Sequence, residues 1–316
     1  MKRLFAAVGM VLLTACNGST TATTIAGNSA SDSSTVPTTT PSTVTVTADN
    51  GEVTIIGEPR RIVSLSATHT EILYAIGAGD AVVATDLTSD YPPQAETTDK
   101  VDAFNFSVEA VAALQPDLAV LAFDFQGEVE SLESLGIPTL LLGPAATLDD
   151  AYRQVVVLGR ATFHEEEAEA TADAMRSRID AAVESFGTIS GGASVYHEVD
   201  DTLFSANSAT LLGDIFRRLG LRNIADAVPD EFGSGFVQLS EEFILFSDPT
   251  IIVLGDASFG VTAQSLFDRP GWETLSAVTE GRVIELVGDI PGRWGPRTPE
   301  LVEEIVGAAL PMLVEG

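Results

Sequence analysis

Two Ser-x-Glu pieces, 133 residues apart, form the most regular chemical pattern in the chain. The stretches around them align without a gap and match Ser107 to Ser240 and Glu109 to Glu242. In each copy the serine predicts a helix N-cap and the glutamate lies where it can offset the helix dipole. A proline then ends the helix before a buried strand. The glutamates are therefore either dipole-compensating residues or a matched pair of surface carboxylates, one on each of two lobes.

Residues typical of catalysis or metal binding are scattered along the chain. The three histidines, His69, His164 and His197, have no spacing that would gather them with acidic metal ligands. The chain contains neither a G-x-x-x-x-G-K-[ST] phosphate loop nor a G-x-S-x-G elbow, and no nucleophile–base pair stands out. We therefore expect no enzyme activity, no metal centre and no cofactor. His69, just before a predicted helix, is either a contact in a binding cleft or a solvated loop residue.

Cys16 is the only cysteine, so the chain can form no internal disulfide. Lys2 and Arg3 precede an apolar run from Leu4 to Leu13, which is too short to span a bilayer but fits the core of a signal peptide. The Leu-Thr-Ala-Cys sequence that follows resembles a bacterial lipobox. That resemblance implies cleavage before the cysteine and a lipid on its sulfur, and a plain secretory signal is the alternative.

The segment after the signal peptide (residues 1–15) is expected to be a lipidated cysteine followed by a flexible tether, over residues 16–43. Of the 27 residues from Asn17 to Thr43, 15 are Ser or Thr, a composition that cannot bury enough apolar surface to fold. The net charge of −30 argues against nucleic acid and anionic lipid as direct partners. We expect an extracytoplasmic protein, anchored to the cell membrane by the lipid on Cys16.

Residues 44–316 are long enough for two lobes. The runs Val44–Ala48 and Val53–Ile56 flank an Asn-Gly turn and predict a β-hairpin. After the hairpin, short β-branched runs alternate with helical patterns, which predicts parallel α/β structure. Further strands are predicted at residues 61–65, 81–84, 118–121, 139–142, 194–197, 251–254 and 283–286.

Two helices are predicted in the middle of the chain, at residues 148–160 and 165–186. A Thr-x-x-Glu capping box, formed by Thr162 and Glu165, is expected to start the second helix. The second helix is long enough to cross from one lobe to another.

The predicted fold class is therefore α/β, with two Rossmann-like parallel lobes joined by a single long helix. The lobes are expected at residues 44–163 and 189–316, with the connecting helix at 164–188. Ligands of parallel α/β sheets lie beyond the carboxyl ends of the strands, so a ligand cleft is expected between the lobes.

Several sequence pieces resemble a known family, the substrate-binding proteins of ABC importers that have one helical connector and carry vitamin B12, ferric siderophores or haem. The pieces are 61–66 with 70–73, 89–94, 113–118, 132–138, and 271–278 with 281–283. The resemblance implies a monomeric receptor that delivers a small molecule to a permease with its cytoplasmic ATPase. It also implies that Glu109 and Glu242 dock onto arginines of the permease. A surface enzyme and an adhesion lipoprotein without a small ligand are the alternatives from other classes.

The ligand-specific positions are most similar to those of the vitamin B12-binding members. The resemblance implies ligand contacts at Tyr91, Phe104, Phe204, Phe236, Asp289 and Arg293. The position of His69 before a helix makes it a further candidate. Phe104 and Phe236 stand where those members have tryptophan, which shrinks the stacking surface. Phe123, Phe125 and Trp294 could compensate, or could belong to the core or rim.

The ligand is thus expected to be cobalamin or a related corrinoid, with a ferric hydroxamate siderophore or haem as the alternative. Aromatic faces can bury such a large flat molecule while a few polar groups orient it. Few cationic residues match the expected cleft, mainly Arg293, with Arg297 as a further candidate. This scarcity favours a nearly neutral ligand over a strongly anionic one.

Overall fold

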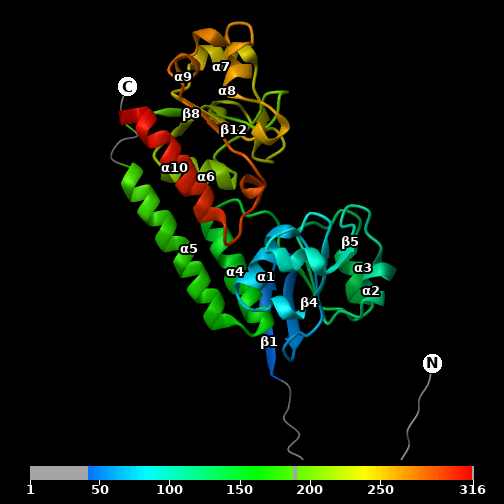
Figure 1. The fold of residues 1–316 in the computed structure, drawn as a ribbon. Coiled ribbons are helices and arrows are strands. Elements are labelled where there is room, and N and C mark those ends of the chain that lie inside the picture. Colours follow the sequence, from blue (N-terminus) through cyan, green and yellow to red (C-terminus); the bar gives the residue numbers. More distant parts are fainter. Residues whose placement is uncertain (1–41, 188–190, 315–316) are drawn as a thin grey trace, which may run out of the picture. The chain divides into compact units, whose positions relative to one another are not determined.

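The computed structural model describes residues 42–187 and 191–314 (Figure 1). The expected signal peptide, Cys16 and all but the last residues of the expected tether lie outside these ranges. The described part begins with a hairpin of β1 (Thr43–Ala48) and β2 (Gly51–Ile56), which confirms the predicted pair of strands. Its turn is fixed to the first sheet, because the Asn50 side chain accepts a hydrogen bond from the backbone N–H of Leu141 at 3.0 Å.

The first sheet is parallel and has five strands in the order β5-β4-β3-β6-β7. Their bounds are β3 (Ile62–Leu65), β4 (Val82–Asp86), β5 (Asp99–Val101), β6 (Leu118–Leu121) and β7 (Thr139–Leu141). Four of them confirm predicted strands within two residues at each end. The short edge strand β5 was not predicted, since it lacks a β-branched run. The ammonium group of Lys100 ties it to the sheet by donating to the Thr85 hydroxyl at 2.8 Å.

Three helices accompany this sheet: α1 (Ala67–Ala75), α2 (Val108–Ala113) and α3 (Glu128–Ser134). Helix α1 starts three residues before the apolar pattern that begins at Thr70. It ends where Gly77 takes φ of +89°, a backbone conformation that favours glycine. This early start puts His69 inside a buried helix rather than in a loop before one.

The second sheet is also parallel, with four strands in the order β10-β8-β12-β13. These are β8 (Ser194–Glu198), β10 (Arg222–Asn223), β12 (Ile251–Leu254) and β13 (Val283–Glu285). A separate antiparallel pair joins β9 (Phe204–Ala206) to β11 (Phe236–Gln238). The accompanying helices are α6 (Leu211–Arg218), α7 (Glu241–Ser247), α8 (Ala263–Phe267) and α9 (Ser276–Thr279). The two parallel sheets confirm the predicted α/β class.

Three longer helices pack together: α4 (Leu148–Thr162), α5 (Glu165–Phe186) and α10 (Thr298–Val314). Helix α5 packs against both α4 and α10 (Figure 1). Its bounds confirm the predicted long helix. One apolar cluster runs from the first sheet at Ile62, through Leu158 and Ile179 of α4 and α5, to Val253 of the second sheet. Among the described residues, no helix is both long enough and apolar enough to span a membrane.

The capping box predicted at Thr162 and Glu165 is wrong. Thr162 lies in the last turn of α4, where its hydroxyl donates to the Leu158 carbonyl at 2.8 Å. The residue that caps α5 is His164, and its side chain makes no capping bond. The turn between the helices has only two residues, so the threonine still belongs to the preceding helix.

Candidate ligand-binding site

Two neighbouring pockets lie at the carboxyl ends of the parallel strands. The first, of about 350 Å³, is lined by residues just after β3, β4 and β6, and the second, of about 520 Å³, by residues at the ends of β8 and β12. Both pockets share Gly292, Arg293 and Trp294 as lining residues. The two pockets therefore meet at this short segment, which follows the 3₁₀ helix η6 (Ile290–Gly292). This is the edge where ligands of parallel α/β sheets are found.

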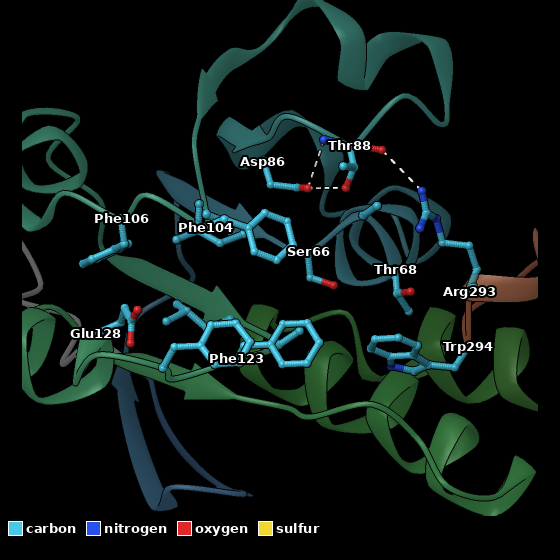
Figure 2. A pocket seen from close by; sticks show the side chains of 17 residues that line it. Ser66, Thr68, Asp86, Thr88, Phe104, Phe106, Phe123, Glu128, Arg293 and Trp294 are labelled. Carbon is cyan, nitrogen blue, oxygen red and sulfur yellow. Dashed lines mark hydrogen bonds between the residues drawn. The ribbon is translucent and has the colours of Figure 1, made fainter. Parts of the chain in front are cut away.

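The wall of the first pocket is strongly aromatic. Phe104, Phe106, Phe123, Phe125 and Trp294 all line it. Phe123 and Phe125 stack with their ring centroids 5.0 Å apart and their planes at 10°. Figure 2 shows Phe104 and Phe123 facing the hollow from opposite sides, with Trp294 at one end. Such a wall suits a flat, largely apolar ligand.

Polar groups at the first pocket are already engaged with the protein. Asp86, at the end of β4, accepts the backbone N–H of Thr88 at 3.0 Å and bonds to its hydroxyl (Figure 2). Glu128 accepts the backbone N–H of Gln126 at 2.7 Å. Both carboxylates are buried. A bound molecule thus meets two acidic side chains, Asp86 and Glu128, at this wall.

The second pocket is more apolar. Its lining includes Phe236, which is 46% exposed, with Leu211, Leu212 and Ala145. His197 also lines it, although neither ring nitrogen is exposed or hydrogen-bonded. Burial lowers the pKa of His197 to about 4, so this imidazole is neutral near pH 7.

The structure brings three of the expected ligand contacts to the pockets. Phe104 lines the first pocket, Phe236 lines the second, and Arg293 lines both. Trp294, Phe123 and Phe125, whose role the sequence left open between ligand contact, core and rim, are pocket-lining residues. The other four expected contacts line neither pocket: His69, Tyr91, Phe204 and Asp289.

His69 is fully buried, so the structure contradicts both a direct cleft contact and a solvated loop position. Its Nε2 lies 3.1 Å from Oε1 of Gln154 on α4, and its ring meets Trp294 edge-on. Burial lowers the pKa of His69 to about 4. The indole of Trp294 donates to the same Gln154 oxygen at 2.8 Å. His69 therefore stands behind the pocket wall and contacts the residue that forms it.

Asp289 and Arg293, expected as a polar pair reaching the ligand, both belong to an ionic cluster, and only Arg293 of the two lines the pockets. Glu71 on α1 pairs with Arg297, whose Nε donates to Oε2 of Glu71 at 2.9 Å. Arg297 also donates from Nη2 to Asp289 at 2.8 Å. The guanidinium of Arg297 lies over the ring of Tyr91, 4.4 Å from its centroid. Tyr91 is thus a partner of the cluster, and not a lining residue.

The Arg293 guanidinium completes this cluster. Its Nη2 lies 3.2 Å from Asp289 and its Nε lies 3.5 Å from Glu71. It also donates to the Thr88 carbonyl at 3.4 Å (Figure 2). Sequence reasoning missed Glu71, which is 226 residues from its partner Arg297. The only available signal was a lone acidic residue in an otherwise apolar helical piece.

The two glutamates of the repeat lie where the alignment predicts. Ser107 accepts the backbone N–H of Ala110 at 3.2 Å and caps α2, and Ser240 caps α7 in the same way. Glu109 and Glu242 are the second residues of these helices, and both are exposed. The caps are confirmed, and the role of the glutamates in docking stays a prediction.

The comparisons with known proteins agree with this architecture. Residues 62–289 match the family model described as periplasmic binding protein, so the chain belongs to that family. It is 33% identical over 273 residues to an ABC transporter substrate-binding lipoprotein, YvrC, of Bacillus subtilis, covering 84% of each chain. It is 30% identical over 246 residues to the vitamin B12-binding protein of Pectobacterium carotovorum, covering 76% of this chain and 84% of that one.

A solved structure shows the same fold. The periplasmic haem-binding protein RhuT of Roseiflexus superposes with a TM-score of 0.70 at 24% identity, covering 81% of this chain and all of that one. Both lobes and the long helix that joins them are thus features of the family. The chain is the periplasmic substrate-binding component of an ABC transporter, a family of binding and transport proteins.

Proposed function

We propose that this protein captures cobalamin or a related corrinoid and delivers it to the permease of an ABC importer. The observation that carries the proposal is the pair of pockets that meet at Trp294, one with an aromatic wall and one with a largely aliphatic lining that includes Phe236. A corrin is large and flat, and stacked aromatic side chains bury such a surface at little conformational cost. The vitamin B12-binding relative that shares 30% of its residues over most of its length supports this choice.

The charge around the pockets supports a nearly neutral ligand. Of the described residues, Arg293 is the only lysine or arginine that lines either pocket. It lies in ion-pair distance of both Glu71 and Asp289. A strongly anionic chelate would call for arginines without such partners.

A ferric hydroxamate siderophore or haem is the second candidate. Phe104 and Phe236 stand where the resemblance to vitamin B12-binding members implies tryptophan, so the stacking area offered to a corrin is smaller. A smaller chelate with an apolar shell would fill the same pockets. The solved structures of this fold include a haem-binding protein, and the fold itself does not select among these ligands.

The mode of action that we propose includes a lipid anchor on Cys16 and a tether of residues 16–43. The tether would hold the two-lobed body, with lobes at 44–163 and 189–316 about the connecting helix 164–188, near its permease. Exposed Glu109 and Glu242 would face that partner. The lipobox resemblance and the Ser/Thr-rich composition support the anchor and the tether.

Titration of the purified protein with cyanocobalamin tests the ligand. We expect a sub-micromolar dissociation constant by calorimetry and a shift in the corrin absorbance. Phe123→Ala should weaken binding about tenfold or more, because stacking on an aromatic ring is lost. Phe246→Ala, on the exposed face of α7, is the matched control and should leave binding unchanged. Absence of heat and of a spectral shift with both cobalamin and cobinamide would reject the corrinoid, and titration with ferric hydroxamates and haem would then decide the alternative.

A further inference from the structure

An ionic cluster lies next to the two pockets, although the proposed ligand is nearly neutral. It contains two arginines, Arg293 and Arg297, and two acids, Glu71 and Asp289. The Glu71 side chain is only 2% exposed and lies on α1, whereas the other three follow β13 near the far end of the chain. The cluster therefore joins α1 of the first lobe to the segment that carries Trp294.

Arg293 is the cluster member that reaches the ligand space. It lines both pockets, and its side chain is 16% exposed. A guanidinium in this position would attract an anion strongly, since the surrounding aromatic wall lowers the local dielectric. Glu71 and Asp289 balance the two positive charges of Arg293 and Arg297, so the cluster as a whole carries no net charge. Their negative charges act over the same short distances as the positive charge of the arginine.

The remaining charges at the wall add to this effect. Asp86 and Glu128 line the first pocket and are both buried. With Glu71 ionised, the four charges of the cluster balance, and Asp86 and Glu128 leave the first pocket with an excess of negative charge that disfavours an anion. Without the charge of Glu71, the same pocket shape would offer one more uncancelled positive charge to a ligand.

We propose that Glu71 is a specificity-determining residue: it balances the charge of the cluster formed with Arg297 and Arg293, and so makes the pockets reject anionic ligands of a shape that they otherwise accept. Glu71 contacts no ligand itself and acts through Arg293 as a positioning residue. The proposal rests on the proposed function in one respect, that these two pockets are the ligand site.

A pair of fluorescent probes separates charge from shape. 8-Anilino-1-naphthalenesulfonate and N-phenyl-1-naphthylamine share an aromatic skeleton and differ by one sulfonate. The wild-type protein should bind the neutral amine more tightly than the sulfonate. Glu71→Gln should tighten the sulfonate about tenfold relative to the amine, since one buried negative charge is removed near the site. A loosened fold would change both probes together, so the ratio of the two dissociation constants reports charge alone.

Two control variants make the result specific. Glu303→Gln removes the same charge from the exterior of α10, where Glu303 pairs with Arg178, and should leave the ratio unchanged. Trp294→Ala should weaken both probes alike. Unchanged probe binding in Trp294→Ala would place the probes elsewhere and overturn the proposal.

Glu71→Gln removes a buried charge partner of Arg297, so a second variant keeps the test independent of whether this one folds. The ratio of the two dissociation constants is therefore also measured in Asp289→Asn. It removes a less buried acid from the same cluster and should shift the ratio in the same direction, by a smaller factor. An unchanged ratio in the variant that folds overturns the proposal. Because neither probe is a corrinoid, a shift in the ratio without cobalamin binding would reject the proposed ligand and still support the role of Glu71.

Discussion

At the scale of single residues, the side chains that line the pockets are positioned by polar side chains that do not line them. Gln154 accepts a hydrogen bond from Trp294 and contacts His69, and Glu71 bonds to Arg297 and lies 3.5 Å from Nε of Arg293. Neither His69 nor Glu71 lines a pocket. Burial also shifts the pKa values of these groups: desolvation raises the pKa of Glu71, against the lowering effect of Arg297 and Arg293, and lowers the pKa of His69.

The two buried histidines predict a loss of stability in mild acid. The pKa of His69 and that of His197 are each lowered from 6.5 to about 4, so the unfolded chain binds protons that the folded chain does not. Each neutral histidine contributes roughly 3 kcal/mol to the free energy of unfolding. This contribution is complete above pH 6.5 and is lost as the pH falls toward 4. Asp256, whose pKa burial raises to about 6, acts in the opposite direction and offsets part of this loss.

Urea unfolding at pH 7.0 and pH 5.0 measures this dependence. Stability should fall between the two pH values in the wild-type protein, and the fall should be smaller in His69→Gln and in His197→Gln. His164→Gln, at a half-buried position whose Nδ1 lies 2.7 Å from the Thr162 carbonyl, should keep the wild-type fall. An equal fall in all four proteins would contradict the assignment to buried histidines.

At the scale of elements, the sequence pattern gives most strands of the parallel sheets and the helices α4 and α5 well, and it gives the junctions less well. Helix α5 has the predicted bounds, because its apolar and charged residues alternate with helical period over six turns. The capping box was assigned to the wrong place. It forms at the start of α4, where Thr147 accepts the backbone N–H of Asp150 at 3.1 Å and the Asp150 carboxylate accepts the Thr147 N–H.

This difference gives a prediction for two threonines. Thr147→Val should lower the free energy of unfolding by about 1 kcal/mol, since an N-cap is lost. Thr162→Val should cost less, because its hydroxyl only donates back to the Leu158 carbonyl within the same helix. Urea unfolding of the two variants compares them directly. A larger cost at Thr162 would mean that the predicted box between the two helices forms in solution.

At the scale of the whole molecule, the receptor role requires two surfaces that act separately. The two pockets proposed to hold the ligand lie at the carboxyl ends of the strands. Glu109 and Glu242 lie exposed at the starts of α2 and α7, and neither lines the two larger pockets. Binding and delivery should therefore be separable by mutation.

The double variant Glu109→Ala with Glu242→Ala is expected to bind ligand as the wild-type protein does but to stop uptake by cells. Each alanine removes a carboxylate that could pair with a permease arginine, while the serine caps remain. Calorimetry measures binding, and accumulation of labelled ligand measures uptake. Glu166→Ala with Glu167→Ala, in the exposed first turn of α5, is the control and should leave both unchanged. Loss of ligand binding in the isolated double variant would argue against a docking role.

The sequence by itself determined most strands of the two parallel sheets, the helices α4 and α5, the repeat and the family. β-branched runs predicted the buried strands, and the Ser-x-Glu copies predicted two capped helices that the structure confirms. These features follow from local propensity and from periodicity, which depend on residues a few positions apart. The aromatic residues of the pocket wall were visible in the sequence, although their role was left open.

Only the tertiary structure decided which side chains form the pockets and which stand behind them. His69 and Asp289 looked like ligand contacts, yet His69 is enclosed by α1 and α4, and Asp289 pairs with Arg297. The pairing of Glu71 with Arg297 joins residues 226 positions apart. Such contacts arise because burial requires each charged group to find a partner in space, and one sequence does not state which distant residue will supply it.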